Sequence, residues 1–391
     1  MAQKSKKKES IFSKIFSKGQ IDYSILVVTL LLLSIGIIMV LSASAPTSLS
    51  EDGNSYSYVK KQALAAFGGL IAMIFFSLFD YKYYRKLKWP IYFGILALLF
   101  VVSISGLSEG GARRWINIAG INFQPSEIAK VAFILFFASY LSDVKENNKI
   151  KHFGYGCLLP LALLVPMAGI ILGLQNHMSA TLVIGAITLV QMFVAGTRVS
   201  HLLLVVVVGG LSALGVFKVK DLMSADAGES TGFRSERIKV WLDPFSDPKG
   251  KGYQIIQSLY AIGSGGIFGL GLWQSKQKYL YLPEPHNDFI FAVLAEELGF
   301  IGCVLVIILF MIFIWRGIII AIKAPDNFGT LIAIGIVAMI GLQALINIAV
   351  VTGTIPVTGM PLPFFSYGGT AMLVNLGAVG ILLNISKSYN K

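Results

Sequence analysis

Ten apolar runs constrain this chain more than any other feature of its sequence. They lie at about 23–42, 63–79, 90–107, 127–142, 157–174, 178–195, 202–217, 289–315, 328–351 and 370–386. Most are long enough to cross a hydrocarbon core, which is about 30 Å thick and needs about 20 helical residues. Inside lipid each run must close its own backbone hydrogen bonds, so we predict helices. With 55% hydrophobic and 13% charged residues, the expected fold is an all-α polytopic membrane protein of about ten transmembrane helices.

The net charge is +12, but the basic residues lie mainly in the loops and the tails. The charge therefore does not indicate a nucleic-acid-binding surface. With the N-terminus inside, the segments on the cytoplasmic side carry eighteen basic residues, and the short outer loops carry only Lys60, Lys61, Arg113 and Arg114. This asymmetry predicts that both termini are cytoplasmic. Residues 1–20 are expected to form an uncleaved basic tail, because the first apolar run is longer than a signal-peptide core, and residues 21–391 a transmembrane domain.

The segment 218–288 is expected to be one long, ordered extracellular loop between helices 7 and 8. It contains apolar anchors such as Trp241, and Ile255, Ile256, Leu259 and Ile262 fall on one helical face. This pattern predicts an amphipathic helix lying on the membrane. Three other outer segments, 108–127, 175–179 and 352–369, are rich in polar residues, glycine or proline. We therefore predict that the functional site lies on the extracellular side of the membrane.

Asp288 is the first candidate for chemistry, in YLPEPHNDFIFAVLAEELG at 281–299. On local sequence alone the preferred interpretation is that Asn287 or Asp288 caps the following helix, as Asn and Asp often do. However, Asp288 also lies near Glu284 and His286 at the expected water–lipid boundary. A partly desolvated carboxylate has a raised pKa and suits a general base.

Glu296 and Glu297 are carboxylates placed inside an apolar run. Intramembrane charges are costly and normally face a partner or a wet cavity. The sequence offers Lys130 as that partner, so an interhelical ion pair that fixes packing is the preferred interpretation.

A second cluster comprises Gln124, Ser126, Glu127 and Lys130 at the start of a predicted helix. Ser126 is expected to cap this helix, and Glu127 is favoured near its N-terminus by the helix dipole. Glu127 and Lys130 are three residues apart and so share a face. Arg113 and Arg114 lie outside against the charge trend, where they suit a pyrophosphate or anionic lipids.

The remaining signals favour structural roles. Cys157 and Cys303 lack ligand-like spacing, the glycines at 261–272 lack the strand and Lys-Ser/Thr of a phosphate loop, and His177 is expected to be a packed residue. No metal site is predicted.

Four motifs in order make the chain resemble the SEDS family (FtsW, RodA and SpoVE). They are RRWINIAGINFQPSEIAK (113–130), the segment 237–272, YLPEPHNDFIFAVLAEELG (281–299) and GTIPVTGMPLPFFSYGGT (353–370). QSKQKYLYLPEPH (274–286) looks closest to the FtsW/SpoVE division or sporulation branch. Asn287 departs from the threonine usual in the family, but it keeps a small polar group, so activity is expected to survive.

The resemblance implies a peptidoglycan glycosyltransferase that polymerises lipid II on the outer face of the bacterial cytoplasmic membrane, at the division septum. It places the family's presumed catalytic aspartate at Asp288. Arg113, Arg114 and Lys130 are then candidates to balance the pyrophosphate, with Glu127 positioning Lys130, and Gln124, Ser126 and His286 as further substrate-binding candidates. It implies a class B penicillin-binding protein and other divisome proteins as partners, besides membrane lipids. No cofactor is required by the sequence, although it leaves room for a divalent cation.

Two other functions fit the same sequence. A lipid II flippase would need many helices and intramembrane charge, but alternating access favours a midplane site and an internal repeat, whereas the polar residues gather outside. A non-catalytic division scaffold would need no base at Asp288.

Overall fold

The computed structural model of the protein describes residues 19–109, 112–118, 121–175, 177–209, 240–250 and 252–389. Its long helices are α2 (Tyr23–Asp52), α3 (Ser57–Leu78), α5 (Lys88–Ser105), α6 (Pro125–Glu146), α8 (Met178–Ala195), α12 (Ile290–Lys323), α13 (Asn327–Val351) and α14 (Gly369–Tyr389). Between α6 and α8, α7 (Leu159–Ala168) is continuous with the π-helical turns η1 (Gly154–Leu158) and η2 (Gly169–Leu174). Shorter elements are α4 (Tyr83–Lys86), the 3-10 turn η3 (Pro244–Ser246) and α11 (Tyr253–Gly265).

The described residues contain 8 helices that are long and apolar enough to cross a membrane, including the continuous helix 154–174. α6 has 22 residues but a more polar composition. Val199–Gly209 is a shorter apolar helix, and the rest of the run predicted at 202–217 lies outside the described residues, as does most of the 1–20 tail. The protein is thus a multi-pass membrane protein, whereas ten spans and their orientation stay predictions.

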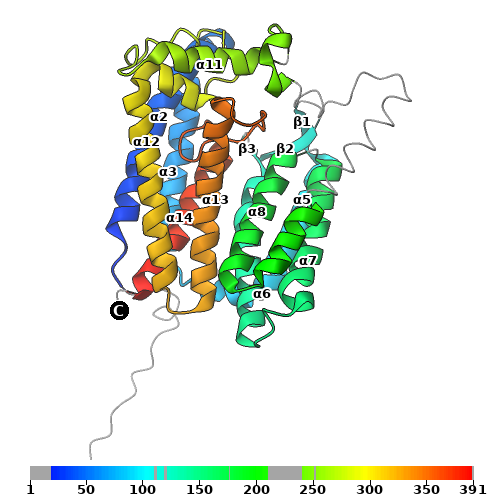
Figure 1. Cartoon of the computed structure of the whole chain (residues 1–391). Helices are drawn as coiled ribbons and strands as arrows, with labels where there is room; N and C mark the ends of the chain where they lie inside the picture. Colours follow the sequence, from blue (N-terminus) through cyan, green and yellow to red (C-terminus); the bar gives the residue numbers. More distant parts are fainter. Residues whose placement is uncertain are drawn as a thin grey trace, which may run out of the picture.

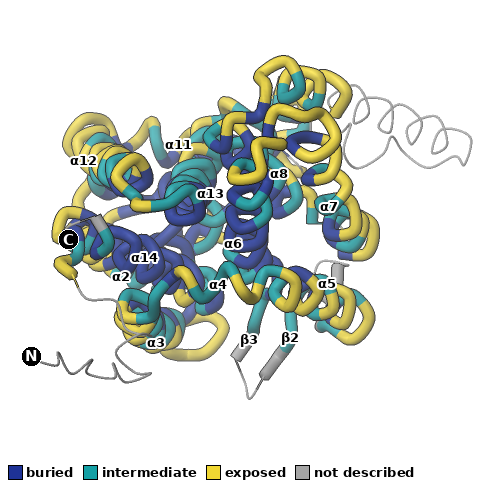
Figure 2. The backbone as a smooth tube through the Cα atoms, turned by 90° about the horizontal axis from the view of Figure 1, so that it is seen from below, coloured by how far each residue is buried: buried dark blue, intermediate teal, exposed yellow. Residues whose placement is uncertain are grey.

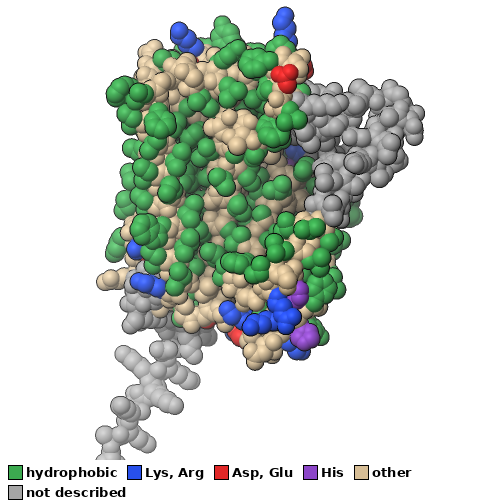
Figure 3. Space-filling model, viewed as in Figure 1, with side chains coloured by type: hydrophobic (Ala, Val, Ile, Leu, Met, Phe, Trp, Pro, Cys, Tyr) green, Lys and Arg blue, Asp and Glu red, His purple; other side chains and the backbone are tan. Residues whose placement is uncertain are grey.

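The helices form a bundle whose interior is built mainly by α6, α13 and α14. These helices are the most buried in the axial view, and α3, α5, α7 and α12 expose their outer faces (Figure 2). α13 packs against α12, α8 and α6, and α14 packs against α3. Apolar side chains cover the flank of the bundle as a broad belt (Figure 3). This distribution suits lipid around a packed core.

The two described ends of the chain meet at one end of the bundle, away from α11 (Figure 1). The backbone N–H of Asp22 donates to Ser386 Oγ at 3.0 Å. Asp22 also forms an ion pair with Arg316 near the end of α12. This arrangement agrees with an even number of spans.

The prediction of an all-α fold is wrong in one place, where a small sheet lies at the α11 end. β1 (Leu107–Glu109), β2 (Ala112–Ile118) and β3 (Ile121–Phe123) form an antiparallel sheet in the order β1-β2-β3. Trp115, Ile116 and Phe123 are aromatic or β-branched residues that favour strands. Ile116 pairs with Phe123 in the β2–β3 register.

The predicted amphipathic helix in the long loop is present as α11, which lies across the top of the bundle (Figure 1). Ile255 and Ile256 are buried against the bundle, and Ser258 Oγ donates to the carbonyl of Val351 at 2.7 Å. Leu259 and Tyr260 are exposed. The helix is therefore confirmed, and Ile255 and Ile256 of the predicted face are buried. This face packs on protein rather than on the membrane, and Leu259, which was expected on it, is exposed.

α12 is broken at Gly299, where φ is 65° and ψ is −167°. The segment after α11 runs alongside the break and replaces the missing helical hydrogen bonds. Leu270 N donates to Glu296 O at 2.9 Å and Gly271 N to Glu297 O at 3.0 Å, while Phe300 N donates to Gly266 O at 2.9 Å. The glycines of this segment thus serve close backbone packing, as the sequence suggested.

Gly299→Ala should destabilise the protein, since only glycine readily adopts this backbone conformation. The strain costs about 1–3 kcal/mol, and the new Cβ would lie 2.2 Å from Gly269 N. The melting temperature of the purified protein in detergent should fall. Gly263→Ala is the matched control, because its Cβ would meet open space on α11. An unchanged melting temperature in Gly299→Ala would contradict the close packing of segment 265–271 against the break in α12.

Candidate functional site

Asp288 lies in the loop just before α12. The first turns of α12 lie at the same end of the bundle as α11 (Figure 1). The capping interpretation is wrong, because the N-cap residue of α12 is Phe289 and no side chain caps the helix. The Asp288 side chain is half-buried and its Oδ2 faces Gly359, where an added Cβ would lie 3.4 Å away. Gly359 has φ of 67°, so a glycine there both permits the turn and leaves room beside the carboxylate.

The backbone around Asp288 is fixed by polar side chains from two other segments. Asn347 of α13 donates to the carbonyls of Asp288 at 2.8 Å and Met360 at 2.7 Å. Ser366 Oγ donates to the carbonyl of Asn287 at 2.8 Å and accepts from Leu362 N at 2.7 Å. The carboxylate therefore stands on a backbone whose position is set by α13 and by the 352–369 segment.

The environment of Asp288 makes it a weaker acid than an ordinary aspartate. Burial raises the pKa of Asp288 to about 6, and the negative charge of Glu284 adds to the shift. A carboxylate that titrates near neutrality accepts protons more readily than one with the usual pKa, which suits a general base.

His286 is buried in an aromatic cage next to Asp288. Its ring lies edge-on to Tyr58 at 4.8 Å and to Tyr367 at 5.7 Å between centroids. Burial lowers the pKa of His286, so the imidazole is neutral at physiological pH. Its Nδ1 finds no hydrogen-bond partner within the described residues, which leaves a polar atom available two residues before the candidate base in the chain.

Glu127 and Lys130 form a buried ion pair in the first turns of α6, as their spacing predicted. Lys130 Nζ lies 2.8 Å from Glu127 Oε1 and 2.7 Å from Oε2. The cap predicted for Ser126 is wrong: Gln124 is the N-cap residue, Pro125 and Ser126 are already helical, and Ser126 Oγ is buried without a partner among the described residues. Pro125 suits the first helical position because it has no N–H to satisfy.

A positive group adjoins this ion pair. Arg114 Nε donates to the carbonyl of Gln175 at 2.9 Å. Burial, followed by the charges of Arg114 and Lys130, lowers the pKa of His177 to about 3. Both cations are therefore close enough to act on His177, which stays neutral. The Arg113 side chain lies outside the described residues.

The 352–369 segment connects the two clusters. Thr358 accepts a hydrogen bond from Ser179 at the start of α8, and the next residue, Gly359, faces Asp288. At the other end Thr370 Oγ1 accepts from Gln124 N at 3.2 Å. The 352–369 segment thus contacts Asp288 and His286. Thr370 in the adjoining first turn of α14 contacts Gln124, which precedes the helix of the Glu127–Lys130 pair.

Glu296 and Glu297 do not pair with Lys130, so that prediction is wrong. Glu297 Oε1 lies 2.8 Å from Lys278 Nζ and accepts from Ser42 Oγ at 2.6 Å. Glu296 accepts from Ser275 Oγ at 2.5 Å and from Lys276 N at 2.9 Å. The loop 274–278 folds back onto the first part of α12, and its residues, rather than Lys130 of α6, contact these carboxylates. Both glutamates are structural, as the network interpretation required.

Metal-ligating residues do not gather in the described part of the chain. No group of three or more His, Cys, Asp or Glu side chains there could hold an ion. The divalent cation for which the sequence left room remains a prediction.

Comparison with known proteins assigns the family. The model of the cell cycle protein family FtsW/RodA/SpoVE matches residues 23–391. The chain is 44% identical to stage V sporulation protein E of Bacillus subtilis over 94% of this chain and 97% of that protein. It is 40% identical to a probable peptidoglycan glycosyltransferase FtsW of Geobacter sp., over 93% of this chain and 96% of the relative. The chain belongs to the FtsW/RodA/SpoVE family.

Solved structures agree with this assignment to the FtsW/RodA/SpoVE family. The fold matches a chain of a peptidoglycan synthase complex with a TM-score of 0.75 and 28% identity, over 94% of this chain and 98% of the other. It matches RodA of Thermus thermophilus with a TM-score of 0.67 and 26% identity, over 94% and 96% of the two chains.

Several residues that build the site in this FtsW/RodA/SpoVE protein escaped sequence reasoning. Asn347 and Gln62 lie in apolar helices, and Gln62 binds the carbonyl of Ser366 at 3.1 Å and the N–H of Gly368 at 3.1 Å. Polar residues inside apolar runs are a signal for a partner, which would have flagged both. Lys278 and Tyr58 had no such signal, because they lie among other polar loop and helix-end residues.

Lys278→Met should destabilise the protein strongly, because it leaves the Glu297 carboxylate buried without its cation. Removing one partner of a buried pair costs about 3–5 kcal/mol. Lys278→Met/Glu297→Gln should recover much of that loss, since no unpaired charge remains. Thermal unfolding in detergent measures both. Lys276→Met, an exposed lysine of the same loop, is the control, and equal melting temperatures for all variants would contradict the buried pair.

Proposed function

We propose that this protein is a peptidoglycan glycosyltransferase that polymerises lipid II at the outer face of the bacterial cytoplasmic membrane. The relatives named FtsW carry the description probable peptidoglycan glycosyltransferase, and this chain matches them over nearly its whole length. The observation that carries the proposal is Asp288, a carboxylate with its pKa raised to about 6 on a backbone fixed by α13 and the 352–369 segment.

In the proposed reaction Asp288 acts as the general base. The 4-hydroxyl oxygen of the acceptor sugar forms a bond to the anomeric carbon of the donor, and the bond from that carbon to the pyrophosphate oxygen breaks. The hydroxyl proton passes to the Asp288 carboxylate, and undecaprenyl pyrophosphate leaves with the electron pair. Attack from the face opposite the leaving group inverts the anomeric centre.

The leaving pyrophosphate needs positive charge, for which Arg114 and Lys130 are the candidates, together with Arg113. Fixed cations in a water-poor site stabilise developing negative charge effectively. Glu127 holds Lys130 at 2.8 Å and so sets its position. Gln124, Ser126 and His286 supply polar atoms for the sugars. Ser126 Oγ and His286 Nδ1 have no hydrogen-bond partner among the described residues, which supports this role.

The flippase alternative gains no support from the intramembrane charges that suggested it. Lys278 and Glu297 are closed into a buried pair, and Lys130 is held by Glu127. The pair at Lys278 thus has a structural role. A non-catalytic scaffold would not need a carboxylate such as that of Asp288, whose pKa is raised and whose backbone is held in place.

Placement at the division septum and pairing with a class B penicillin-binding protein belong to the same proposal. Similarity to a chain of a peptidoglycan synthase complex and to the sporulation protein of Bacillus subtilis supports a cell-wall assembly with a transpeptidase. Vegetative division and sporulation are both compatible with these relatives.

Asp288→Asn should reduce polymerisation of fluorescent lipid II by at least about a hundredfold, because a general base contributes about 10²–10⁴ to the rate. The assay uses purified protein with and without a class B penicillin-binding protein, and reads glycan strands on a gel. Asp243→Asn, at an exposed loop carboxylate, is the control.

Polymer from Asp288→Asn at near wild-type rate would refute the base assignment. Transfer of lipid II across protein-bearing vesicles without polymer would instead support the flippase. Normal division by cells that carry only Asp288→Asn would support the scaffold.

The polymerisation rate should fall as pH drops through about 6, because the base must be ionised and the pKa of Asp288 is about 6. Below that value the rate should decrease about tenfold per pH unit. Glu284→Gln should move this limb to lower pH, since the charge of Glu284 raises the pKa of Asp288. If the acidic side of the pH–rate profile lies at the same pH in Glu284→Gln as in the wild type and in the reference variant Asp243→Asn, this electrostatic coupling is contradicted.

A further inference from the structure

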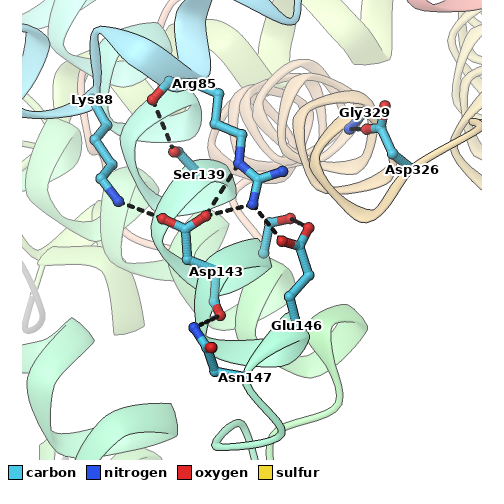
Figure 4. A network of polar contacts seen from close by, with 9 residues as sticks. Arg85, Lys88, Ser139, Asp143, Glu146, Asn147, Asp326 and Gly329 are labelled. Carbon is cyan, nitrogen blue, oxygen red and sulfur yellow. Dashed lines mark hydrogen bonds and ion pairs between the residues drawn. The ribbon is translucent and has the colours of Figure 1, made fainter.

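A second polar region lies at the opposite end of the bundle and takes no part in the proposed reaction. Arg85 Nη2 lies 2.6 Å from Asp143 Oδ1 and 2.6 Å from Glu146 Oε2, and Lys88 pairs with the other oxygen of Asp143 (Figure 4). These contacts join α4 and the first turn of α5 to the last turns of α6. Basic side chains also gather at this end below the apolar belt (Figure 3).

A cavity of about 270 Å³ opens beside this network. Its walls come from the start of α5, the end of α6 and η1. They include charged groups as well as aromatic and apolar ones. The members that matter here are Lys88, Trp89, Asp143, Lys149, Tyr155 and Leu159.

Lys149 is the cation of this cavity that is left for a ligand. Its Nζ lies 4.9 Å from the centroid of the Tyr155 ring, and it forms no ion pair with a carboxylate among the described residues. By contrast, Arg85 and Lys88 are already paired with Asp143 and Glu146. The charged residues that line the cavity are Lys88, Lys149 and Asp143. Because Lys88 pairs with Asp143, the surplus positive charge lies on Lys149.

The mouth of the cavity is apolar and faces outward from the bundle. Trp89 is 43% exposed, Leu159 40% and Tyr155 48%. Phe93, one turn beyond Trp89, and Leu158, beside Leu159, are also exposed. Aromatic residues of this kind are typical of the membrane–water interface, so the cavity joins the polar end to the lipid-facing flank.

We propose that this cavity binds an anionic phospholipid of the adjacent leaflet. The phosphodiester lies at Lys149, with Lys88 beside it, and an acyl chain lies along Trp89 and Leu159. A basic pocket between membrane helices suits a negatively charged headgroup. The exposed apolar mouth favours a lipid over an acidic protein segment, because an acyl chain packs well on Trp89 and Leu159, whereas an acidic segment would place charged side chains against these apolar groups.

The test is native mass spectrometry of the full-length protein with phosphatidylglycerol or phosphatidylcholine of equal chain length. The wild type should bind one phosphatidylglycerol more tightly than any phosphatidylcholine. Lys149→Gln should weaken that binding about fivefold, as expected for one lysine near an anionic lipid. Lys149→Arg keeps the charge and should preserve binding. Lys151→Gln, an exposed lysine two residues away, should leave it unchanged.

Leu159→Trp provides a second, charge-neutral test by narrowing the cavity at an exposed position. It should weaken phosphatidylglycerol binding although every charge is retained. Equal losses in Lys149→Gln and Lys151→Gln would show diffuse attraction and overturn the site. Binding that is the same for both lipids, or that survives both Lys149→Gln and Leu159→Trp, would also overturn it and leave the cavity to an acidic protein segment.

Discussion

The break in α12 is the constraint on which the α11 end of the bundle depends. At Gly299 the helix loses backbone hydrogen bonds in a region where water is scarce, and unsatisfied groups there are costly. The segment 265–271 replaces those bonds, and the carboxylates of Glu296 and Glu297 hold the following loop through Ser275 and Lys278. The loop then leads into Pro283–Asp288, so the position of the candidate base depends on these contacts between the loop and α12.

The 352–369 segment provides the second support of the site. Asn347 and Ser366 fasten it to the backbone of Asp288 and Asn287, and Thr358 reaches α8 through Ser179. Consequently the carboxylate that is proposed as base and the cations proposed for the pyrophosphate belong to one fixed frame. The opposite end carries a separate charged network around Asp143, which joins α5 to α6 and borders the cavity proposed for a lipid.

Sequence reasoning succeeded where one physical rule dominated. As far as the structure describes them, the apolar runs coincide with helical structure, because lipid leaves the backbone few alternatives, and Glu127 and Lys130 pair because helical spacing brings them together. It failed where neighbours compete. Lys130 looked suitable for Glu296 and Glu297, but Lys278 lies closer after the loop folds back. The three-stranded sheet was missed because the search followed long apolar runs rather than short strand-forming ones outside them.

By itself the sequence determined a multi-pass helical membrane protein, the end at which its polar motifs gather, and Asp288 as the candidate base. These follow from run length, local spacing and motif order, which need no knowledge of distant contacts. Only the tertiary structure decided which charges meet, why the pKa of Asp288 is raised, and that Asn347, Ser366 and Gly359 surround it. Those features depend on burial and on contacts between segments far apart in the chain, where geometry rather than composition selects the partner.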